Sequence, residues 1–489
     1  MEDMLAASAY LAETIRSNDG FAEAMNTIVP MYLAKGEVDM AAELSNAVDD
    51  PFVRDRLLSQ VAEKCADMDD DDYAVQLAEA VEDHGIRAEA FERIALLKAS
   101  KGQLEKAESI AAEMQHPDFV YAAIAVNKAA AGDDAGAAAE LEKIEFPAAI
   151  VHALQAMATQ RAAAGERDAA SELLTQAVGE AAEIDHAEEK IRSLFEIGQS
   201  YIEAGQNERA VEVFEAARTE AEQLGNVHRD SFLANAALGF LQGGNVEMAD
   251  RTLDSVADKT QISSALLGFS RELWKKEERA DALEALEEAY SVLKSQREAE
   301  TRDTRSKMRL FTSIAAQFAG FEKGERAIGI AEEIADDTEK MSALTQIAQV
   351  LTMRKENEQA RQALNSIPDD GQRVFALLGM SDAAEKNGDR DKALSLLNEA
   401  ADLGDTVPQL SVRTAAYNEM VKRFAGLGDA ARAAAVNAAN IGAIASIRDE
   451  SIRAAMLAAS YETVENTGLK YGDDEWETVR SLIRKVELG

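Results

Sequence analysis

Residues 194–217 read LFEIGQSYIEAGQNERAVEVFEAA and contain two helical patterns separated by a glycine. The first pattern has large apolar residues spaced as on one face of a helix, at Leu194, Ile197 and Tyr201. Gly205 follows, and glycine ends helices readily because it adopts the left-handed backbone conformation without a steric penalty. A second apolar stripe comes next, at Ala210, Phe214 and Ala217. The stretch therefore predicts a hairpin of two helices.

The same pattern recurs along the chain. With the turn position of each copy numbered zero, the zero positions are 36, 69, 102, 132, 165, 205, 244, 277, 322, 355, 388 and 428, and six of the eleven spacings are 33 residues. Offset −11 is large and apolar in all twelve copies, offset −8 in eleven, and offset zero is glycine in eight. Such self-similarity at a fixed period is the signature of a repeat architecture.

Each repeat is predicted to hold two antiparallel helices. Offsets −11, −8, −7 and −4 form one stripe on the first helix, helix A, and offsets +5, +8, +9 and +12 form a stripe on the second, helix B. Small residues at −7 and +5 let the two helices approach closely. A hairpin cannot bury its apolar face alone, so neighbouring repeats must stack. The expected fold is an all-α solenoid.

The repeats resemble tetratricopeptide repeats (TPRs). The sixth repeat shows the family pattern best, with Leu194, Ile197, Gly198, Tyr201, Gly205, Ala210, Phe214 and Ala217. The resemblance covers residues 21 to 440 and implies a right-handed superhelical solenoid whose concave groove is lined by helix A and binds protein segments. Two features depart from the family. The proline that ends the family pattern is missing, and several repeats are 39 to 45 residues long. The repeats with zero positions 165, 205, 277 and 388 have alanine at +12, and we expect extended B helices in them.

The chain ends are expected to cap the solenoid. We predict an N-terminal capping helix in residues 1–20, the repeats in 21–440, and a degenerate repeat with a C-terminal capping helix in 441–489. Leu11, Ala12 and Ile15 occupy helix-B offsets, so the first segment reads as a helix B without a helix A. The C-terminal stripe consists of Trp476, Val479, Ile483 and Val486. The alternative is that the C-terminal helix docks on a partner.

Charge and hydropathy exclude several classes of protein. The chain has 51 Lys and Arg against 90 Asp and Glu, a net charge of −39, which disfavours binding to nucleic acid through a basic surface. Acidic residues spread along the whole chain are typical of halophilic proteins, although an ordinary acidic cytosolic protein remains the alternative. No apolar run is long enough to span a membrane, and the acidic N-terminus does not resemble a signal peptide. We expect a cytoplasmic protein.

Motifs for catalysis, cofactors or metals are missing or incomplete. The sequence lacks a P-loop, a Gly-x-Ser-x-Gly elbow and a His-Glu-x-x-His motif. The acidic run at Asp67, Asp69 and Asp71 lacks the glycine and glutamate of a calcium loop. The five histidines fall near repeat junctions, and Cys65 occupies the apolar offset −4. We therefore predict no catalytic, cofactor or metal site, and no enzymatic activity.

Basic residues recur at offset −15, at the start of helix A: Arg54, Arg87, Lys190, Arg229, Lys307, Lys340, Arg373 and Arg413. We expect their side chains to form ion pairs with acidic residues of the preceding helix B; the alternative is that they contact a ligand.

The positions that would line the groove differ in charge from the rest of the chain. Offsets −13, −10, −6, −3 and −2 give sixty positions with eight acidic and seven basic residues, a net charge of −1. The other 429 residues carry the remaining net charge of −38. In the sixth to ninth repeats the balance turns positive. The predicted binding residues are Arg192, Phe195, Gln199, Gln242, Arg271, Trp274, Lys275 and Arg309. Arginine beside aromatic residues is typical of binding anchors, so the expected ligand is a protein or peptide segment with acidic residues.

The expected function is that of a non-enzymatic scaffold or adaptor, and two alternatives stay open. A regulatory module that senses a small ligand would need a closed polar pocket around Arg192, Arg271 and Trp274. An all-helical enzyme would need carboxylates converging on one face, which the repeat offsets do not show.

Overall fold

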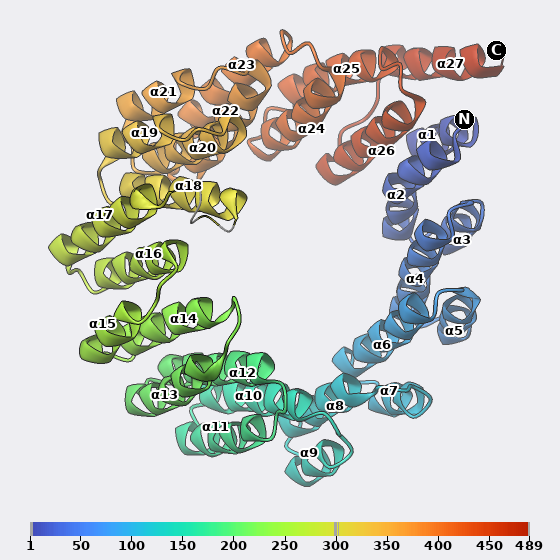
Figure 1. Ribbon diagram of the computed structural model, residues 1–489. Helices are drawn as coiled ribbons and strands as arrows, with labels where there is room; N and C mark the ends of the chain where they lie inside the picture. The colour runs from blue at the N-terminus through green and yellow to red at the C-terminus, as the bar shows by residue number, and fades with distance from the viewer. Residues whose placement is uncertain (1–2, 298–300, 302, 488–489) are drawn as a thin grey trace. The chain divides into compact units, whose positions relative to one another are not determined.

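A computed structural model of the chain describes residues 3–297, 301 and 303–487. Within these residues it contains 27 α-helices and no strand (Figure 1). The helices follow one another as antiparallel hairpins, which confirms the predicted all-α solenoid. None of the helices in this part of the chain is both long and apolar enough to cross a membrane.

Helices A and B alternate through the twelve repeats. The A helices are α2 (Asn18–Lys35), α4 (Pro51–Asp67), α6 (His84–Ser100), α8 (Asp118–Ala130), α10 (Pro147–Ala163), α12 (Ala187–Glu203), α14 (Arg229–Gln242), α16 (Lys259–Lys275), α18 (Thr304–Gly320), α20 (Asp337–Met353), α22 (Asp370–Lys386) and α24 (Leu410–Gly426). The B helices are α3 (Val38–Asn46), α5 (Asp71–Ala80), α7 (Leu104–Ala111), α9 (Asp134–Leu141), α11 (Arg167–Ala182), α13 (Asn207–Gln223), α15 (Val246–Asp254), α17 (Arg279–Ser295), α19 (Gly324–Glu332), α21 (Asn357–Asn365), α23 (Arg390–Gly404) and α25 (Ala430–Ala445).

The turn between the two helices has the same backbone conformation in every repeat. All twelve zero positions have a positive φ, including the four without glycine, Asp69, Glu277, Glu322 and Lys355, at φ 63° to 65°. Helix B then begins two residues later in each repeat. The register read from the sequence is thus confirmed, and four repeats hold an ordinary side chain in a conformation that favours glycine.

Aspartates begin many of the A helices, which accounts for part of the negative charge. At offset −19, side chains such as Asp50, Asp336 and Asp369 accept a hydrogen bond from the backbone N–H three residues later, at 2.8 to 2.9 Å. Each such cap satisfies an amide that the helix leaves unpaired and contributes about 1 kcal/mol.

Helix B has two length classes. The four repeats with alanine at +12 have long B helices, α11, α13, α17 and α23, of 15 to 17 residues, as the sequence predicted. A fifth long helix, α25, has Asn440 at +12 and was not predicted. The other seven B helices have 8 to 10 residues.

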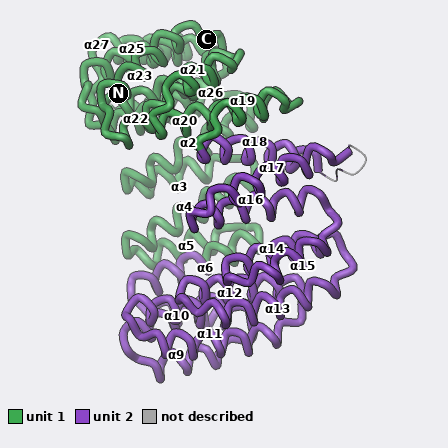
Figure 2. Tube along the Cα trace, turned by 90° about the vertical axis from the view of Figure 1, so that its left-hand side faces the viewer, with its two compact units in different colours: residues 1–91, 322–489 green, residues 92–321 purple. Residues whose placement is uncertain are grey.

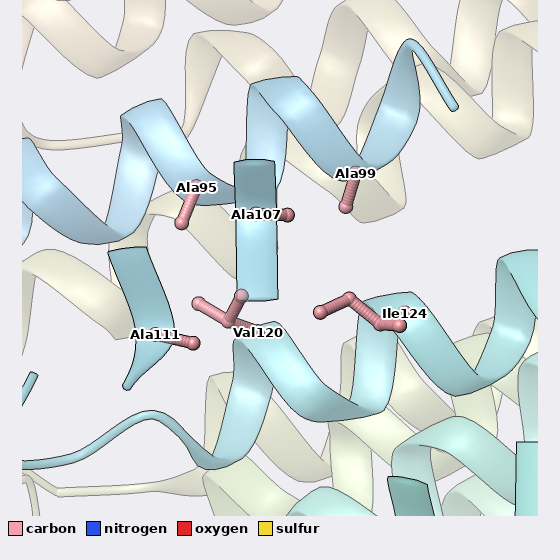
Figure 3. Packing of buried hydrophobic residues seen from close by; sticks show 6 residues of the cluster. All are labelled: Ala95, Ala99, Ala107, Ala111, Val120 and Ile124. Carbon is pink, nitrogen blue, oxygen red and sulfur yellow. The ribbon is translucent and has the colours of Figure 1, made fainter. Parts of the chain in front are cut away.

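The core between repeats is built from small side chains. Figure 3 shows Ala95 and Ala99 of α6, Ala107 and Ala111 of α7, and Val120 and Ile124 of α8, all fully buried. Alanine on both helices of a repeat brings their backbones close, and the larger Val120 and Ile124 of the next helix A fill the space that remains.

The chain divides into two compact units (Figure 2). Unit 1 comprises residues 1–91 and 322–489, and unit 2 comprises residues 92–321. Unit 1 therefore joins the N-terminal and C-terminal parts of the chain.

The first described helices of the chain pack against α26 within unit 1. Helix α26 (Glu450–Thr467) has the features of a thirteenth helix A, because it ends at Gly468 with φ 68° and begins 18 residues before it, as most A helices do. Helix α1 (Met4–Glu13) packs against α26 and α2, and the Ser8 hydroxyl donates to the Ala454 carbonyl at 2.7 Å. Leu11 and Ala12 are buried, so the predicted helix B finds its helix A at the other end of the chain. We call this junction of α1 and α2 with α26 the seam.

The last helix does not pair with α26 as a helix B. Helix α27 (Asp473–Glu487) instead packs against α25 and contacts α1. The place beside α26 that helix B takes in other repeats is filled by α1.

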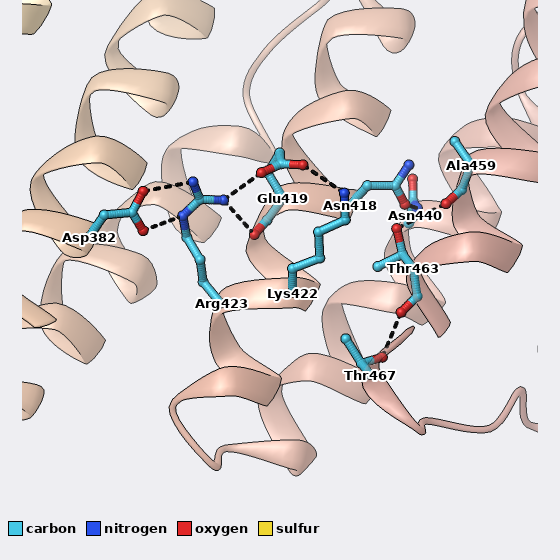
Figure 4. A network of polar contacts seen from close by, with 9 residues as sticks. All are labelled: Asp382, Asn418, Glu419, Lys422, Arg423, Asn440, Ala459, Thr463 and Thr467. Carbon is cyan, nitrogen blue, oxygen red and sulfur yellow. Dashed lines mark hydrogen bonds and ion pairs between the residues drawn. The ribbon is translucent and has the colours of Figure 1, made fainter. Parts of the chain in front are cut away.

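Polar contacts also join neighbouring A helices in unit 1. In Figure 4 the Arg423 guanidinium of α24 makes two hydrogen bonds to Asp382 of α22, at 2.7 and 2.9 Å. It makes two more to Glu419 on its own helix, one to the carboxylate at 2.7 Å and one to the backbone carbonyl at 3.0 Å. The two-pronged geometry fixes how α24 lies on α22.

Four of the eight basic residues at offset −15 have other partners than predicted. Arg87, Lys190 and Arg413 donate to the backbone carbonyls of Val81, Ala182 and Val407, at 2.8 to 3.0 Å. Lys307 likewise donates to the Gln296 carbonyl at 2.6 Å. These carbonyls lie at or just after the C-terminus of the preceding helix B, where helices leave acceptors unpaired and attract cations. The predicted ion pairs with acidic side chains of that helix are therefore wrong for these four residues.

Candidate partner-binding surface on the central A helices

All eight predicted binding residues lie on A helices of unit 2. Arg192, Phe195 and Gln199 belong to α12, Gln242 to α14, Arg271, Trp274 and Lys275 to α16, and Arg309 to α18. The side chains of Arg192, Gln199, Arg271, Lys275 and Arg309 are exposed, and those of Phe195, Gln242 and Trp274 are partly buried. They form two groups along the chain, one on α12 and α14 and one on α16 and α18.

Aromatic rings form the base of the first group. The rings of Phe195 and Phe232 stack with centroids 6.3 Å apart and an interplanar angle of 29°. The Arg192 guanidinium lies 5.9 Å from the Phe232 centroid, and its side chain is 61% exposed. Its contact with Glu188 is long, at 3.5 Å. An exposed cation thus lies over an aromatic surface with only a weak intramolecular ion pair.

A glycine pair holds this aromatic surface in place. The ring of Phe214 lies beside Phe195, with centroids 6.3 Å apart, and packs between Gly198 and Gly239. A Cβ atom at Gly198 would lie 2.4 Å from the Phe214 ring, and one at Gly239 would lie 2.8 Å away. Even a methyl group at Gly198, the residue at offset −7, would displace the Phe214 ring. The glycine therefore allows the helices to pack closely and also keeps the aromatic surface in place.

Two pockets adjoin Arg192. The first, of about 390 Å³, is lined by Arg192, Phe195, Glu196, His228, Ser231, Phe232 and Asn235. The second, of about 560 Å³, is lined by His186, Ala187, Glu188, Glu189, Arg192, Leu224 and Asn226. Neither Arg271 nor Trp274 lines these two pockets. The small-ligand alternative would therefore have to rest on Arg192 without the other two residues.

The second group contributes less free surface than the sequence suggests. The Trp274 ring stacks on Phe321, with centroids 3.8 Å apart and an interplanar angle of 9°, and the Arg279 guanidinium lies 3.8 Å from the Trp274 centroid. Two groups at that distance cannot share one face, so both faces of the indole are covered. Lys275 pairs with Glu272 at 2.7 Å, and Arg271 donates to the Gln317 amide oxygen at 3.0 Å. Trp274 can offer a partner only its edge.

Sequence reasoning missed Phe232. This residue stands at offset −12, next to but outside the five offsets assigned to the groove, and it contributes the ring beneath Arg192. A search for aromatic residues at neighbouring offsets of adjacent repeats would have found it.

Cys65 and the acidic run at Asp67, Asp69 and Asp71 belong to unit 1. Cys65 is completely buried, and burial raises the pKa of its thiol to about 11. Asp69 is a turn residue at zero offset, and Asp67 pairs with Lys64 at 3.0 Å. In the part of the chain that the structure describes, no three His, Cys, Asp or Glu side chains come together as metal ligands.

Comparisons with known proteins concern the fold alone. No protein-family model and no curated protein matches the chain. Among solved structures, it is similar to Ton1535 from Thermococcus onnurineus NA1, at 19% identity over 73% of this chain and 98% of that chain, with a TM-score of 0.27. It is also similar to Naa15/Naa10 bound to HypK-THB, at 12% identity over 78% and 68%, with a TM-score of 0.27.

A third solved structure is a circular tandem repeat protein with novel repeat topology and enhanced subunit contact surfaces. The identity is 14% over 99% of this chain and 96% of that chain, and the TM-score is 0.15. The chain is a helical repeat protein, as its own helices show, and these distant matches say nothing of its partners.

Proposed function

We propose that the chain is a non-enzymatic scaffold or adaptor whose α12–α14 surface binds a segment of another protein. The observation that supports this most is the exposed Arg192 over the stacked rings of Phe195 and Phe232, beside a pocket of about 390 Å³. Arginine and aromatic side chains are the residues that most often dominate binding energies at protein interfaces.

The chemistry of the surface favours a particular kind of segment. A carboxylate of the partner can pair with the Arg192 guanidinium, which is held mainly by the ring beneath it. An apolar side chain next to that carboxylate can enter the pocket beside Phe195. Elsewhere the strong negative charge of the chain repels acidic segments, so the proposal requires binding at this surface to be selective.

The α16–α18 group has a secondary role in this proposal. Arg271 and Arg309 are exposed and can attract further carboxylates, whereas Trp274 serves mainly to join α16 to Phe321. We therefore assign the anchor to Arg192 and Phe195.

The helical hairpins are proposed to be TPR-type repeats, and the protein to be cytoplasmic and adapted to high salt. The offsets of the large and small residues and the shared turn conformation support the repeat type. The distributed acidic residues support the habitat, since charge repulsion is strongly screened at high salt.

A regulatory module that binds a small carboxylate is the second candidate. The two pockets that share Arg192 support it, because Asn226, His228 and Asn235 line them with polar groups. Binding of a small molecule would raise the melting temperature without any protein partner.

A matched pair of variants tests the proposal. Arg192→Glu reverses the charge at the anchor, and Arg209→Glu makes the same change on α13 at a side chain of nearly equal exposure, 62% against 61%. Proteins captured from a lysate are identified, and the affinity of each for the purified variants is then measured. We expect Arg192→Glu to lower the affinity for the true partner at least tenfold. Arg209→Glu should change this affinity less than twofold, since exposed charges away from the anchor contribute little. Equal binding by both variants would refute the assignment to Arg192.

A further inference from the structure

We infer that the seam is also an interaction surface for a second copy of the chain, whose N-terminal helices α1 and α2 can pack on α26 of the first copy. This inference is independent of the proposed function. It rests on the way in which the thirteenth repeat is assembled.

The two sides of the seam are complementary but not continuous. In the other repeats helix B follows helix A after a short turn, whereas α1 and α26 are the first and last partners of one repeat and lie more than 400 residues apart in the chain. Leu5, Leu11 and Ala12 of α1 are buried, as are Ala454, Leu457 and Ala458 of α26. The same contacts form whether the two sides belong to one molecule or to two.

Polar contacts at the seam are specific enough to select this partner. Ser8 is completely buried and donates to the Ala454 carbonyl at 2.7 Å, and the Ser451 hydroxyl donates to Glu23 of α2 at 3.0 Å. Lys35 at the end of α2 pairs with Asp3 at 2.6 Å and lies 5.7 Å from the Tyr461 ring of α26. An unrelated amphipathic helix would lack the Ser8 hydroxyl and the Glu23 carboxylate that bond to α26, and the Lys35 ammonium that lies over its Tyr461 ring.

One edge of the seam is open to solvent. A pocket of about 980 Å³ lies between the two sides and is lined by Thr14 to Ser17, Gly20 and Glu23 from the N-terminal side and by Asp449, Glu450, Ser451, Arg453, Lys485 and Val486 from the C-terminal side. Solvent at this edge lowers the amount of apolar surface that opening must expose. The seam is thus the junction at which the ends can separate and pair with another copy.

Mass action decides between the two pairings. Within one molecule the two sides meet at an effective concentration set by the repeats that connect them, so pairing between molecules becomes appreciable only as the protein concentration approaches that value. Pairing between copies therefore rises with protein concentration.

A disulfide across the seam tests the inference. An ideal Cβ atom at Gly20 lies 3.6 Å from the Cβ of Ser451, within the range of about 3.5 to 4.5 Å that a disulfide needs. The variant Gly20→Cys is mixed with the variant Ser451→Cys at ~0.1 mM, opened briefly in mild denaturant, returned to buffer and oxidised. The only other cysteine, Cys65, is buried.

We expect a covalent dimer that contains one chain of each variant, in an amount above that of the controls and falling on dilution. Each variant alone, treated in the same way, is the control for other pairings. The double variant Gly20→Cys with Ser451→Cys should form its disulfide within one chain at low concentration. If the double variant closes but the mixture yields no more dimer than the controls, or if the double variant does not close, the inference is wrong.

Discussion

The seam and the repeat formed by α22 and α23 solve the same packing problem with different covalent connections. In the continuous repeat, Ser381 of α22 donates to the Ala393 carbonyl of α23 at 3.0 Å, and Gly388 at φ 74° turns one helix into the other. At the seam, Ser8 donates to the Ala454 carbonyl at 2.7 Å without a connecting turn. The comparison teaches that the apolar side chains are sufficient to pair a helix A with a helix B. The turn only keeps the two helices close to each other along the chain.

Removing α1 breaks the comparison most severely. Deletion of residues 1–16 leaves the buried face of α26 uncovered, and the loss of several apolar side chains at about 1.5 to 3 kcal/mol each lowers the local stability by roughly 5 kcal/mol. We expect amide hydrogen exchange in α26 to accelerate at least a hundredfold while α22 and α23 keep their protection. A peptide of residues 3–16 added to the deletion variant should restore the protection of α26. Unchanged exchange in α26 would show that α1 does not serve as its helix B.

A leucine pair sharpens the comparison at single-residue level. Leu11 and Leu396 both stand at offset +8 when α1 is numbered as a helix B, and both are 3% exposed. Replacing either with alanine should cost about 2 to 5 kcal/mol. For Leu396→Ala we expect a lower midpoint of the main unfolding transition in denaturant. For Leu11→Ala we expect a separate transition at lower denaturant concentration that is confined to the seam, and hydrogen exchange of the α1 amides measures it. Equal shifts of one common transition would mean that the seam unfolds together with the rest of unit 1.

The turn residues give a smaller contrast. Gly388→Ala forces a side chain into the left-handed region and should cost about 1 to 2 kcal/mol. Gly468→Ala should cost less, because Gly468 leads to α27, which is not the helix-B partner of α26 and can shift. Lys355→Gly should stabilise the protein by up to about 1 kcal/mol, since Lys355 has φ 65°. Thermal unfolding of the three variants gives the order, and an equal cost at Gly388 and Gly468 would contradict it.

The smallest effect is a difference in pH dependence. Burial lowers the pKa of Lys35 at the seam, but hydrogen bonds to Asp3 and Glu37 outweigh it and raise the pKa overall. Burial lowers the pKa of Lys392 on α23. The stabilisation of the folded state by charged Lys35 is therefore fully present below the ordinary lysine pKa of 10.5, and it is lost as the pH rises through the raised pKa. The cost of charging Lys392 disappears as the pH rises.

Comparing Lys35→Met with Lys392→Met at pH 8 and above 10.5 should show these opposite signs in the melting temperature, as shifts of a degree or two. At the higher pH the loss caused by Lys35→Met should shrink, whereas any gain from Lys392→Met should disappear. The same sign for both variants would contradict the assignment.

The sequence predicted the repeat and its register because both depend on spacing within a short window. Even Glu277 and Lys355, which gave no glycine signal, were assigned correctly from the apolar residues around them. The predicted partners of Arg87 and Arg413 were wrong because every residue has a backbone carbonyl, and the sequence does not indicate which carbonyl is left unpaired. Charge patterns indicate only charged side chains.

Contacts between distant segments were beyond such reasoning. Leu11 and Ala12 marked α1 as a helix B, but nothing near them indicates that α26 is its partner. At the candidate site, the spacing placed Arg192 and Phe195 together, while the covered faces of Trp274 follow from Phe321, which lies 47 positions later in the sequence. Residue type alone could not show that this indole is already occupied.

The closeness of the two chain ends bears on how such a protein can be rearranged. Since α1 contacts both α26 and α27, and the Tyr10 hydroxyl lies 3.5 Å from the Glu487 carboxylate, a peptide linker can be designed to connect α27 to α1. The chain could then be cut in any linker between repeats and still present the same neighbours to every helix. Circular permutation would close the seam covalently through α27 and make an interior junction the new point of closure.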